Sequence, residues 1–365
     1  MNSLTLLVTV VSLFYSTTAE LYCKDENGND VDWFIIYKLP KINHRKGSYF
    51  ADGLKYAYIS GPAIKGKSDE KQWKLSEKQV GDQESIFANT LLPVYKHPQK
   101  YSSLMYNDDV PGGEGNTYYA HAKGVLAMDH ESGFFLTHSI PRFPLAFNNS
   151  RYEYPLSASN NGQTGLCVSF KTQEEAKKIL AHLLVLRPNV YYWNDGKVLD
   201  DNTLFKALVE KKKLKNSAIK TRIVSYKGTP FTAFSKDKKS AVDIYSAYIA
   251  PQLQTDFSVE TWRRGSGNPL PSNCKLKEKV LNVDSLEMKF KSGKQKTTDQ
   301  WLYTQDHAKW AVSDSGKSPF VCISDINRMA SQFKRGGGSL CIHDPDVWTQ
   351  FKGLITSIEP CTKNG

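Results

Sequence analysis

Two short segments of the chain carry the same three side chains in the same order. Each has His-Ala-Lys, a short apolar run and then Asp: His121, Lys123 and Asp129 in the first segment, and His307, Lys309 and Asp314 in the second. In an extended strand, residues i and i+2 point to the same face, so each His would lie beside its Lys. Two such pairs facing each other would form a positive site suited to a phosphate. The lysines would hold its oxygens, and the imidazoles would act as nucleophile or as acid and base.

The sequence around these pairs predicts the elements that must hold them. A turn at 131–133 and a strand at 133–139 follow the first pair, and a strand at 320–325 follows the second. Further strands are predicted at 31–39, 54–60, 163–171, 190–193, 222–226, 231–235, 259–264, 280–290 and 339–343. Helices are predicted at 82–92, 173–186, 202–215 and 326–333, loops at 291–296 and 334–338, and a helix or strand at 347–358. This mixture predicts an α/β (mixed α+β) fold.

The spacing of the two pairs suggests an internal repeat. They lie 186 residues apart (307 minus 121), near half of the chain that would follow a signal peptide. We therefore expect two related sheet-and-helix halves, residues 20–195 and 196–365, joined as a pseudo-dimer with the active site at the seam. Such a chain is expected to be a monomer, although a homodimer stays open.

Composition bounds the class of partner and the compartment. The chain has 365 residues, 40% of them hydrophobic, which is enough to bury a sizeable core. Its net charge of +11 favours an anionic partner, and on charge alone nucleic acid, an anionic membrane and sulfated glycans all stay open. Residues 1–19 resemble a secretory signal peptide, and no later apolar run has the length of a membrane helix.

The cysteines and a sequon fit a secreted protein. There are six cysteines and no CxxC motif, which favours three disulfides in an oxidising compartment over a zinc ribbon or a redox motif. Asn148 begins an Asn-Asn-Ser sequon and is a candidate glycosylation site.

Two other motifs do not indicate a nucleotide-binding or a metal-binding site. Residues 61–68, GPAIKGKS, match the P-loop pattern, but the polar sequence that follows lacks the apolar face of the helix that the motif requires, so a surface turn is favoured. His130 beside Asp129 could join His121 and His138 as metal ligands, but no recognised ligand spacing supports a metal site, and no cofactor is predicted.

Several segments together resemble the deoxyribonuclease II family. They are AHAKGV at 120–125, LTHSIPRFP at 136–144, DHAKW at 306–310 and INRMASQFKRGGGSLC at 326–341. That family resembles the phospholipase D superfamily, whose signature is His-x-Lys, four residues, Asp and then a Gly-Ser-x-Asn-like element. The second copy keeps this order through Asp314, Ser324 and Asn327. In the first copy five residues, not four, separate Lys123 from Asp129. His138 and Ser139 stand where the Gly-Ser-x-Asn-like element should be.

The resemblance implies an endonuclease that cuts double-stranded DNA without metal at acid pH, has little sequence preference and leaves 3′-phosphate ends. His121 would attack phosphorus to form a phosphohistidine, and His307 would protonate the leaving 5′ oxygen and then activate water; the two roles could be exchanged. Lys123 and Lys309 would neutralise the phosphate oxygens, Asn327 would add a donor, and His138 would support the site.

The resemblance also implies the disulfides Cys23–Cys167, Cys274–Cys361 and Cys322–Cys341, the last around a glycine-rich loop whose N–H groups could approach a phosphate. It implies a lysosomal or secreted location. Two alternatives stay open: a DNA-binding homologue of the same fold with weak or no catalysis, and a phosphodiesterase that acts on phospholipid.

Overall fold

The computed structural model describes residues 20–42, 50–66, 70–212, 217–292 and 295–361. The signal peptide predicted at 1–19 lies outside the described residues, as do Lys67 and Ser68 of the P-loop-like motif. A strand, not a helix, begins at Glu70, so the element that a P-loop requires does not follow the motif. Among the described residues, no helix has both the length and the apolar character needed to cross a membrane.

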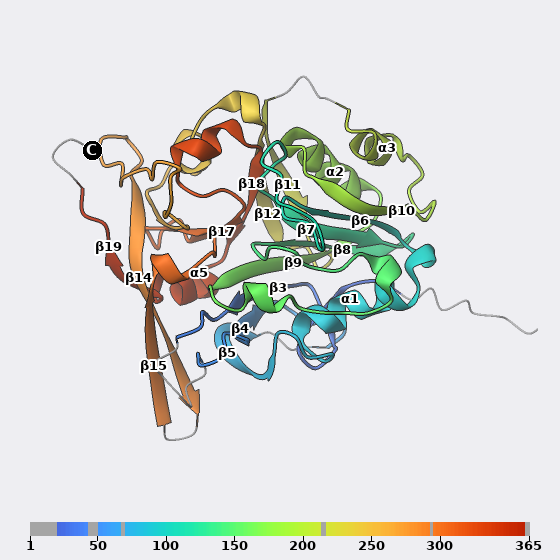
Figure 1. Ribbon diagram of the computed structural model, residues 1–365, viewed down its shortest axis with the longest axis horizontal. Helices are drawn as coiled ribbons and strands as arrows, with labels where there is room; N and C mark the ends of the chain where they lie inside the picture. Colours follow the sequence, from blue (N-terminus) through green and yellow to red (C-terminus); the bar gives the residue numbers. More distant parts are fainter. Residues whose placement is uncertain (1–19, 43–49, 67–69, 213–216, 293–294, 362–365) are drawn as a thin grey trace, which may run out of the picture.

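The first half of the chain forms an eight-stranded sheet (Figure 1), in the order β10-β6-β7-β8-β9-β3-β4-β5. Its strands are β3 (Trp33–Lys38), β4 (Lys55–Ser60), β5 (Glu70–Gln79), β6 (Ser102–Asn107), β7 (Lys123–Met128), β8 (Ser132–His138), β9 (Gln163–Lys171) and β10 (Val190–Asp195). The short strands β1 (Cys23–Lys24) and β2 (Asp30–Val31) pair separately.

The second half forms its own sheet, in the order β11-β12-β18-β17-β16-β13-β14-β15, with β19 paired to β14. Its strands are β11 (Ala218–Val224), β12 (Pro230–Lys236), β13 (Phe257–Glu260), β14 (Val280–Ser292), β15 (Gln295–Leu302), β16 (Trp310–Ser313), β17 (Phe320–Ser324), β18 (Gly337–His343) and β19 (Ile355–Ile358). The predicted mixed α/β class is confirmed.

Helices are few and short. The α-helices are α1 (Ile86–Lys96), α2 (Glu174–Leu186), α3 (Thr203–Val209), α4 (Ala250–Leu253) and α5 (Pro345–Lys352), and a π-helical turn at Tyr245–Ile249 leads into α4. Single 3-10 turns lie at Pro98–Lys100, Phe147–Asn149, Leu156–Ala158, Lys238–Ser240, Tyr303–Gln305 and Ala330–Lys334.

The strands divide their apolar side chains between separate cores, as a period of two requires. On β3, Trp33, Ile35 and Tyr37 belong to a central cluster that takes in α2, α5 and the inner faces of both sheets. Phe34 and Ile36 point the other way, into a second cluster with α1. A third cluster lies between the second sheet and the π-helical turn before α4. The two sheets therefore enclose one continuous core, which holds the halves together.

The two sheets share a strand order. The first contains β3-β9-β8-β7-β6 and the second β12-β18-β17-β16-β13, with antiparallel neighbours throughout both runs. In both, the strand that follows a His-x-Lys pair stands fourth in the run, and a helix (α2 or α5) follows the second strand of the run. This correspondence supports two related halves; their common origin stays a prediction.

Some predicted elements differ from the structure. Helix α1 starts at Ile86 instead of 82, because Ser85 accepts the N–H of Ala88 as the N-cap. The helix predicted at 326–333 is a 3-10 turn at Ala330–Lys334. Of the predicted basic loop at 291–296, residues 291–292 belong to β14 and 295–296 to β15, and 293–294 lie outside the described residues. Strands β14 and β15 project from the body in Figure 1.

Three more predicted elements have different bounds in the structure. The helix predicted at 202–215 ends at Val209. The segment 347–358, predicted as a helix or a strand, contains the end of α5 and all of β19. The histidines of both His-x-Lys pairs precede their strands instead of lying in them, since β7 begins at Lys123 and β16 at Trp310.

The glycine-rich segment is packed rather than open. Gly336, Gly337 and Gly338 are buried, and the last two lie in β18. A Cβ on Gly337 would lie 2.4 Å from Ile326 Cγ1, and the Gly338 N–H donates to Asp325 Oδ2 at 2.9 Å. The Gly338 N–H is therefore not free to bind a phosphate, and the glycines admit close packing of β18.

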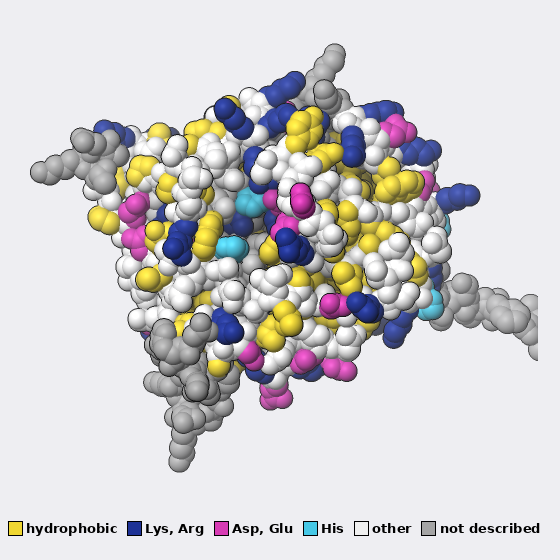
Figure 2. All heavy atoms as spheres, in the orientation of Figure 1, with side chains coloured by type: hydrophobic (Ala, Val, Ile, Leu, Met, Phe, Trp, Pro, Cys, Tyr) yellow, Lys and Arg dark blue, Asp and Glu magenta, His cyan; other side chains and the backbone are white. Residues whose placement is uncertain are grey.

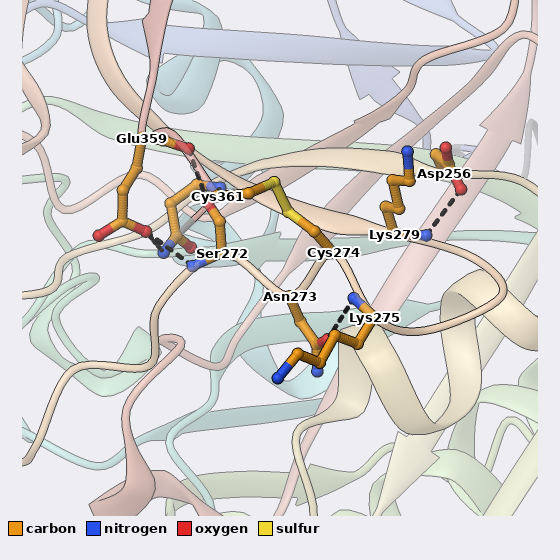
Figure 3. Close-up of a disulfide and its surroundings, with 9 residues drawn as sticks. Asp256, Ser272, Asn273, Cys274, Lys275, Lys279, Glu359 and Cys361 are labelled. Atoms are coloured by element: carbon orange, nitrogen blue, oxygen red, sulfur yellow. Dashed lines mark hydrogen bonds between the residues drawn. A yellow bond between two sulfur atoms is a disulfide. The ribbon is translucent and has the colours of Figure 1, made fainter. Parts of the chain in front are cut away.

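Three disulfides join the pairs Cys23–Cys167, Cys274–Cys361 and Cys322–Cys341, the pairing that the resemblance implies. Cys322 and Cys341 are directly opposed on β17 and β18. Cys274–Cys361 ties the C-terminal segment to the loop before β14 (Figure 3). Beside it, Glu359 accepts the N–H of Ser272 at 2.7 Å, so a disulfide and a hydrogen bond both join these two segments.

Candidate active site

The two histidines occupy corresponding positions at the seam between the halves. The backbone N–H of His121 donates to the carbonyl of Gly336 at 2.9 Å, and that of His307 donates to the carbonyl of Gly162 at 2.8 Å. Gly336 directly precedes β18 and Gly162 directly precedes β9, which are the corresponding strands of the two sheets. Each histidine is thus fixed by the opposite half, and neither half alone would hold its own His-x-Lys pair.

The two lysines are buried beside the histidines. Lys123 is 5% exposed and Lys309 is 4% exposed. Burial, and after it the nearby charge of Lys123, lowers the pKa of Lys309 to about 7. Both lysines act electrostatically on both histidines, so the four side chains share one positive site. The structure therefore brings the two predicted pairs together.

Both imidazoles are neutral in the substrate-free protein. Burial, with added repulsion from Lys309 and Lys123, lowers the pKa of His307 to about 3. Burial also lowers the pKa of His121 well below its usual range, and the attraction of Asp108 offsets this only in part. The contact of 3.8 Å between His121 Nε2 and Asp108 Oδ2 is thus one between a neutral ring and a carboxylate.

A polar network surrounds His121. Gln332 Oε1 accepts from His121 Nδ1 at 2.7 Å, which places the ring proton on Nδ1 and leaves the lone pair on Nε2. Asp108 accepts hydrogen bonds from Lys123 and, at 3.0 Å, from Arg335. Burial would raise the pKa of Asp108, but Lys123, His121 and Arg335 outweigh it and hold that pKa well below its usual range. A fixed carboxylate thus positions two cations beside the imidazole.

His307 has a different environment. Its ring meets that of Trp262 edge to face, with 4.2 Å between the ring centroids. Its Nε2 is buried and has no hydrogen-bond partner among the described residues. Lys309 Nζ donates to the His307 carbonyl at 3.0 Å, which ties the lysine to the same turn of backbone. The second histidine therefore keeps one ring nitrogen available to a ligand.

His138 and Asn327 are both buried near these pairs. The register pairs Gly124 with Thr137, so His138, next along β8, lies beside Lys123. His138 Nδ1 accepts the N–H of Ile140 at 3.2 Å, so the neutral ring carries its proton on Nε2, which has no partner in the described part of the chain. Asn327 follows β17, and its Oδ1 likewise has no partner there. Both side chains retain unused polar atoms that a ligand could satisfy.

The two aspartates of the repeated motif lie away from the pairs. Asp129 caps the β7–β8 turn and accepts the N–H groups of Glu131 and Ser132, roughly 20 Å along the strand from Lys123. Asp314 follows β16 and accepts from Ser258 and Lys352. Both aspartates therefore hold local structure and lie outside the site.

In the ranges that the structure describes, no three His, Cys, Asp or Glu side chains are grouped so that they could hold a metal ion. His130 is exposed on the β7–β8 turn, at the far end of β7 from His121. A groove between β5, β14 and α5 contains none of the histidines. Figure 2 shows histidine side chains near the centre of one face, beside both basic and acidic side chains.

Sequence reasoning missed four side chains of this site. Arg335 was predicted in the glycine-rich loop, Gln332 in a helix and Trp262 in a strand, whereas Asp108 fell in none of the predicted elements. Two of them, Gln332 and Arg335, approach His121 only after the two halves pack.

Two His-x-Lys pairs at the seam of two sheets define a mixed α/β protein with a basic, histidine-containing site of the kind that suits a phosphoester. The model of the deoxyribonuclease II family matches residues 22–361. The human protein named deoxyribonuclease-2-beta is 34% identical over 94% of this chain and 92% of its own length. The Caenorhabditis elegans deoxyribonuclease-2 is 34% identical over 93% and 94%, and the Sus scrofa deoxyribonuclease-2-alpha is 31% identical over 97% and 94%.

The chain belongs to the deoxyribonuclease II family. Membership supports a deoxyribonuclease function with DNA as the substrate. The three disulfides fit a secreted or lysosomal protein.

Proposed function

We propose that the protein is an acid endodeoxyribonuclease that hydrolyses DNA without metal through a phosphohistidine and leaves 3′-phosphate ends. The single observation that carries the proposal is the reciprocal anchoring of the histidines. His121 is bonded to Gly336 and His307 to Gly162, so two neutral imidazoles and two lysines share one site. One phosphate in that site could meet a nucleophile and an acid at once.

The surroundings of the histidines favour one assignment of roles. Gln332 holds the proton of His121 on Nδ1, so Nε2 carries the lone pair that an attack on phosphorus requires. His307 has a free Nε2 and a neighbouring indole, which suits a proton donor to the leaving oxygen. We therefore propose His121 as nucleophile and His307 as general acid.

The chemistry balances in two steps. In the first, His121 Nε2 forms a bond to phosphorus while the bond from phosphorus to the 5′ oxygen breaks, and that oxygen takes a proton from His307. In the second, His307 accepts a proton from water, the water oxygen bonds to phosphorus, and the P–N bond breaks with its electron pair returning to His121. The phosphate stays on the 3′ oxygen of the upstream fragment.

The other predicted residues have supporting roles in this scheme. Lys123 and Lys309 neutralise the phosphate oxygens, on which charge collects in the transition state. His138 offers a buried N–H from Nε2. Asn327 would donate from Nδ2, because its Oδ1, which has no partner among the described residues, can only accept. Asp108 positions Lys123 and Arg335 but makes no bond to the phosphate.

Acid dependence follows from the lowered pKa of the acid. His307 must be protonated to donate, and in the free protein its pKa is about 3. The bound phosphate raises that pKa, since a negative charge favours the imidazolium. The protonated fraction grows as pH falls, so activity should rise toward acid pH until His121 also becomes protonated and loses its lone pair. A lysosome or an acidic exterior would provide such a pH.

The direct test is cleavage of supercoiled plasmid at acid pH in EDTA, with analysis of the ends. Wild type should cut and leave 3′-phosphates. If it bound DNA but did not cut at any pH, even with divalent metal restored, the proposal would give way to a DNA-binding homologue. Release of choline from phosphatidylcholine vesicles, with plasmid left intact, would instead favour a phospholipid phosphodiesterase.

A further inference from the structure

An aromatic side chain is paired with a cation near each histidine: Tyr118 lies three residues before His121 in the chain, and the Trp262 ring contacts that of His307. Beside His121, Lys238 Nζ lies 4.0 Å from the centroid of the Tyr118 ring. Beside His307, the Arg264 guanidinium lies 5.7 Å from the centroid of the Trp262 ring. Each arrangement offers a flat π surface next to a positive charge, the combination that single-stranded nucleic acids use for binding.

The Tyr118 pair is exposed and firmly placed. The Tyr118 side chain is 58% exposed, while the next carbonyls along the chain, of Tyr119 and Ala120, accept from Arg335 at 3.2 and 3.3 Å. Tyr118 and Lys238 come from different halves, so this pair also spans the seam. Lys211, whose Nζ donates to the Tyr119 hydroxyl at 2.9 Å, extends the positive charge away from His121.

The Trp262 pair lies in contact with the proposed general acid. Trp262 is partly buried, and one side of its indole meets the His307 ring. Arg264 is exposed and covers another part of the indole. Arg263, by contrast, is buried and pairs with Asp284 at 2.8 Å, so of these two arginines only Arg264 is directed to solvent.

We infer that these two pairs are nucleotide subsites: Tyr118 with Lys238 holds the nucleotide on the 5′ side of the cut phosphate, and Trp262 with Arg264 holds the nucleoside on its 3′ side. The inference rests on the proposed function. The ligand is a DNA strand whose two bases at the cut are turned out of the base stack. Each base lies on an aromatic ring, and the neighbouring phosphates meet Lys238 and Arg264.

The direction of the strand follows from the roles of the histidines. The fragment that stays attached to His121 carries the 3′ oxygen, so it must extend toward Tyr118. The leaving 5′ oxygen is protonated by His307, so its nucleoside must lie toward Trp262. Exchange of the histidine roles would reverse this direction, which makes the two subsites experimentally distinguishable.

The kinetic test uses an oligodeoxynucleotide with one phosphodiester, all other linkages being neutral methylphosphonates. Two further substrates replace the base on the 5′ or the 3′ side of that phosphodiester by an abasic tetrahydrofuran. Wild type should lose about tenfold in kcat/KM with either abasic substrate, within the usual range for one stacked base. Trp262→Leu should lose only the sensitivity to the 3′ base, and Tyr118→Leu only that to the 5′ base.

The matched control is Trp193→Leu. Trp193 is 51% exposed on the edge strand β10 and has no contact with either histidine among the described interactions. This variant should retain both sensitivities. Equal cleavage of all three substrates by wild type would overturn the inference, as would variants that keep the wild-type sensitivities.

A binding measurement separates this inference from the proposed function. In the His121→Ala protein, 2-aminopurine at either base position should be quenched on binding, and Trp262→Leu or Tyr118→Leu should restore fluorescence at its own position. Quenching with no cleavage by wild type would support the subsites while refuting the nuclease. Unquenched probes bound at saturating protein would refute the subsites, whatever the wild type cleaves.

Discussion

A Cβ atom on Gly336 would lie 2.0 Å from the carbonyl oxygen of Leu186, the last residue of α2. Gly336 belongs to the second half and Leu186 to the first. Because glycine has no Cβ, the two backbones can come into contact at this point. The Gly336 carbonyl then accepts the N–H of His121 at 2.9 Å. The position of His121 thus depends on close packing between the halves.

Gly336→Ala should therefore impair stability and activity together. We expect a loss of at least about 3 kcal/mol in unfolding free energy, because the clash is with backbone. We also expect a loss of roughly 100-fold in kcat at a temperature where the variant is folded, since His121 would shift. Urea unfolding and DNA cleavage measure the two effects. Gly115→Ala is the control, since its Cβ would meet nothing closer than 4.0 Å; equal behaviour of both variants would contradict the role given to Gly336.

Asp108→Asn should alter the pH profile of cleavage. The Asp108 charge raises the pKa of His121, so its removal lowers that pKa further. The acid limb of kcat/KM, where the nucleophile becomes protonated, should move to lower pH, and kcat should fall roughly tenfold because Lys123 and Arg335 lose their shared partner. Asp109→Asn, at the neighbouring residue that pairs with Arg142, should retain the wild-type profile. An acid limb that stays in place would show that Asp108 does not act on His121.

The main elements near the site could be predicted from sequence because their patterns are local. The strand at 163–171 is observed as β9, and the helix at 173–186 as α2, which buries its apolar residues Ala176, Ile179, Leu180, Leu183 and Leu184. The recurrence of His-Ala-Lys also indicated a site made of two halves. Such patterns depend only on residues a few positions apart.

The partners of the histidines could not be predicted in the same way. Gln332 and Arg335 reach the first pair from more than 200 positions away in sequence. The buried glycines resemble a flexible loop because what they require is the close approach of other segments, α2 for Gly336 and Ile326 for Gly337, which sequence does not display. Trp262 suits a strand as well as an active site. Each assignment depends on tertiary packing, for which a single sequence gives no signal.

His182 should make the protein less stable as the pH falls. Burial lowers its folded-state pKa from 6.5 to about 4, so between these values the unfolded chain binds the extra proton. Its contribution to stability is complete above pH 6.5 and is lost progressively toward pH 4, up to about 3 kcal/mol. Denaturant unfolding at several pH values should show a shallower loss for His182→Gln than for wild type. The exposed His97→Gln variant should keep the wild-type slope; an unchanged slope in His182→Gln would rule out this contribution.

The Cys274–Cys361 disulfide should affect stability more than catalysis. It fastens the C-terminal segment beside β14, on a part of the second half that contains no proposed catalytic residue. Replacement of both cysteines by serine should cost about 2–4 kcal/mol of unfolding free energy and leave kcat unchanged at moderate temperature. Breaking Cys322–Cys341 provides the comparison, since that bond joins β17 and β18 directly below the Asn327 segment, and its loss should reduce kcat as well.

The most direct test of the two-histidine mechanism is plasmid cleavage at pH 5 in EDTA by wild type, His121→Ala and His307→Ala. Each reaction is followed by quenching in alkaline denaturant, in which the P–N bond of a phosphohistidine survives, and by analysis of the DNA ends. We expect wild type alone to turn over and to leave 3′-phosphates. An oligonucleotide in which sulfur replaces the 5′ oxygen of one linkage has a leaving group that needs no proton. It should therefore label His307→Ala, which keeps the nucleophile, but not His121→Ala. Labelling of His121→Ala alone would reverse the two roles, and undiminished cleavage by either variant would contradict the mechanism.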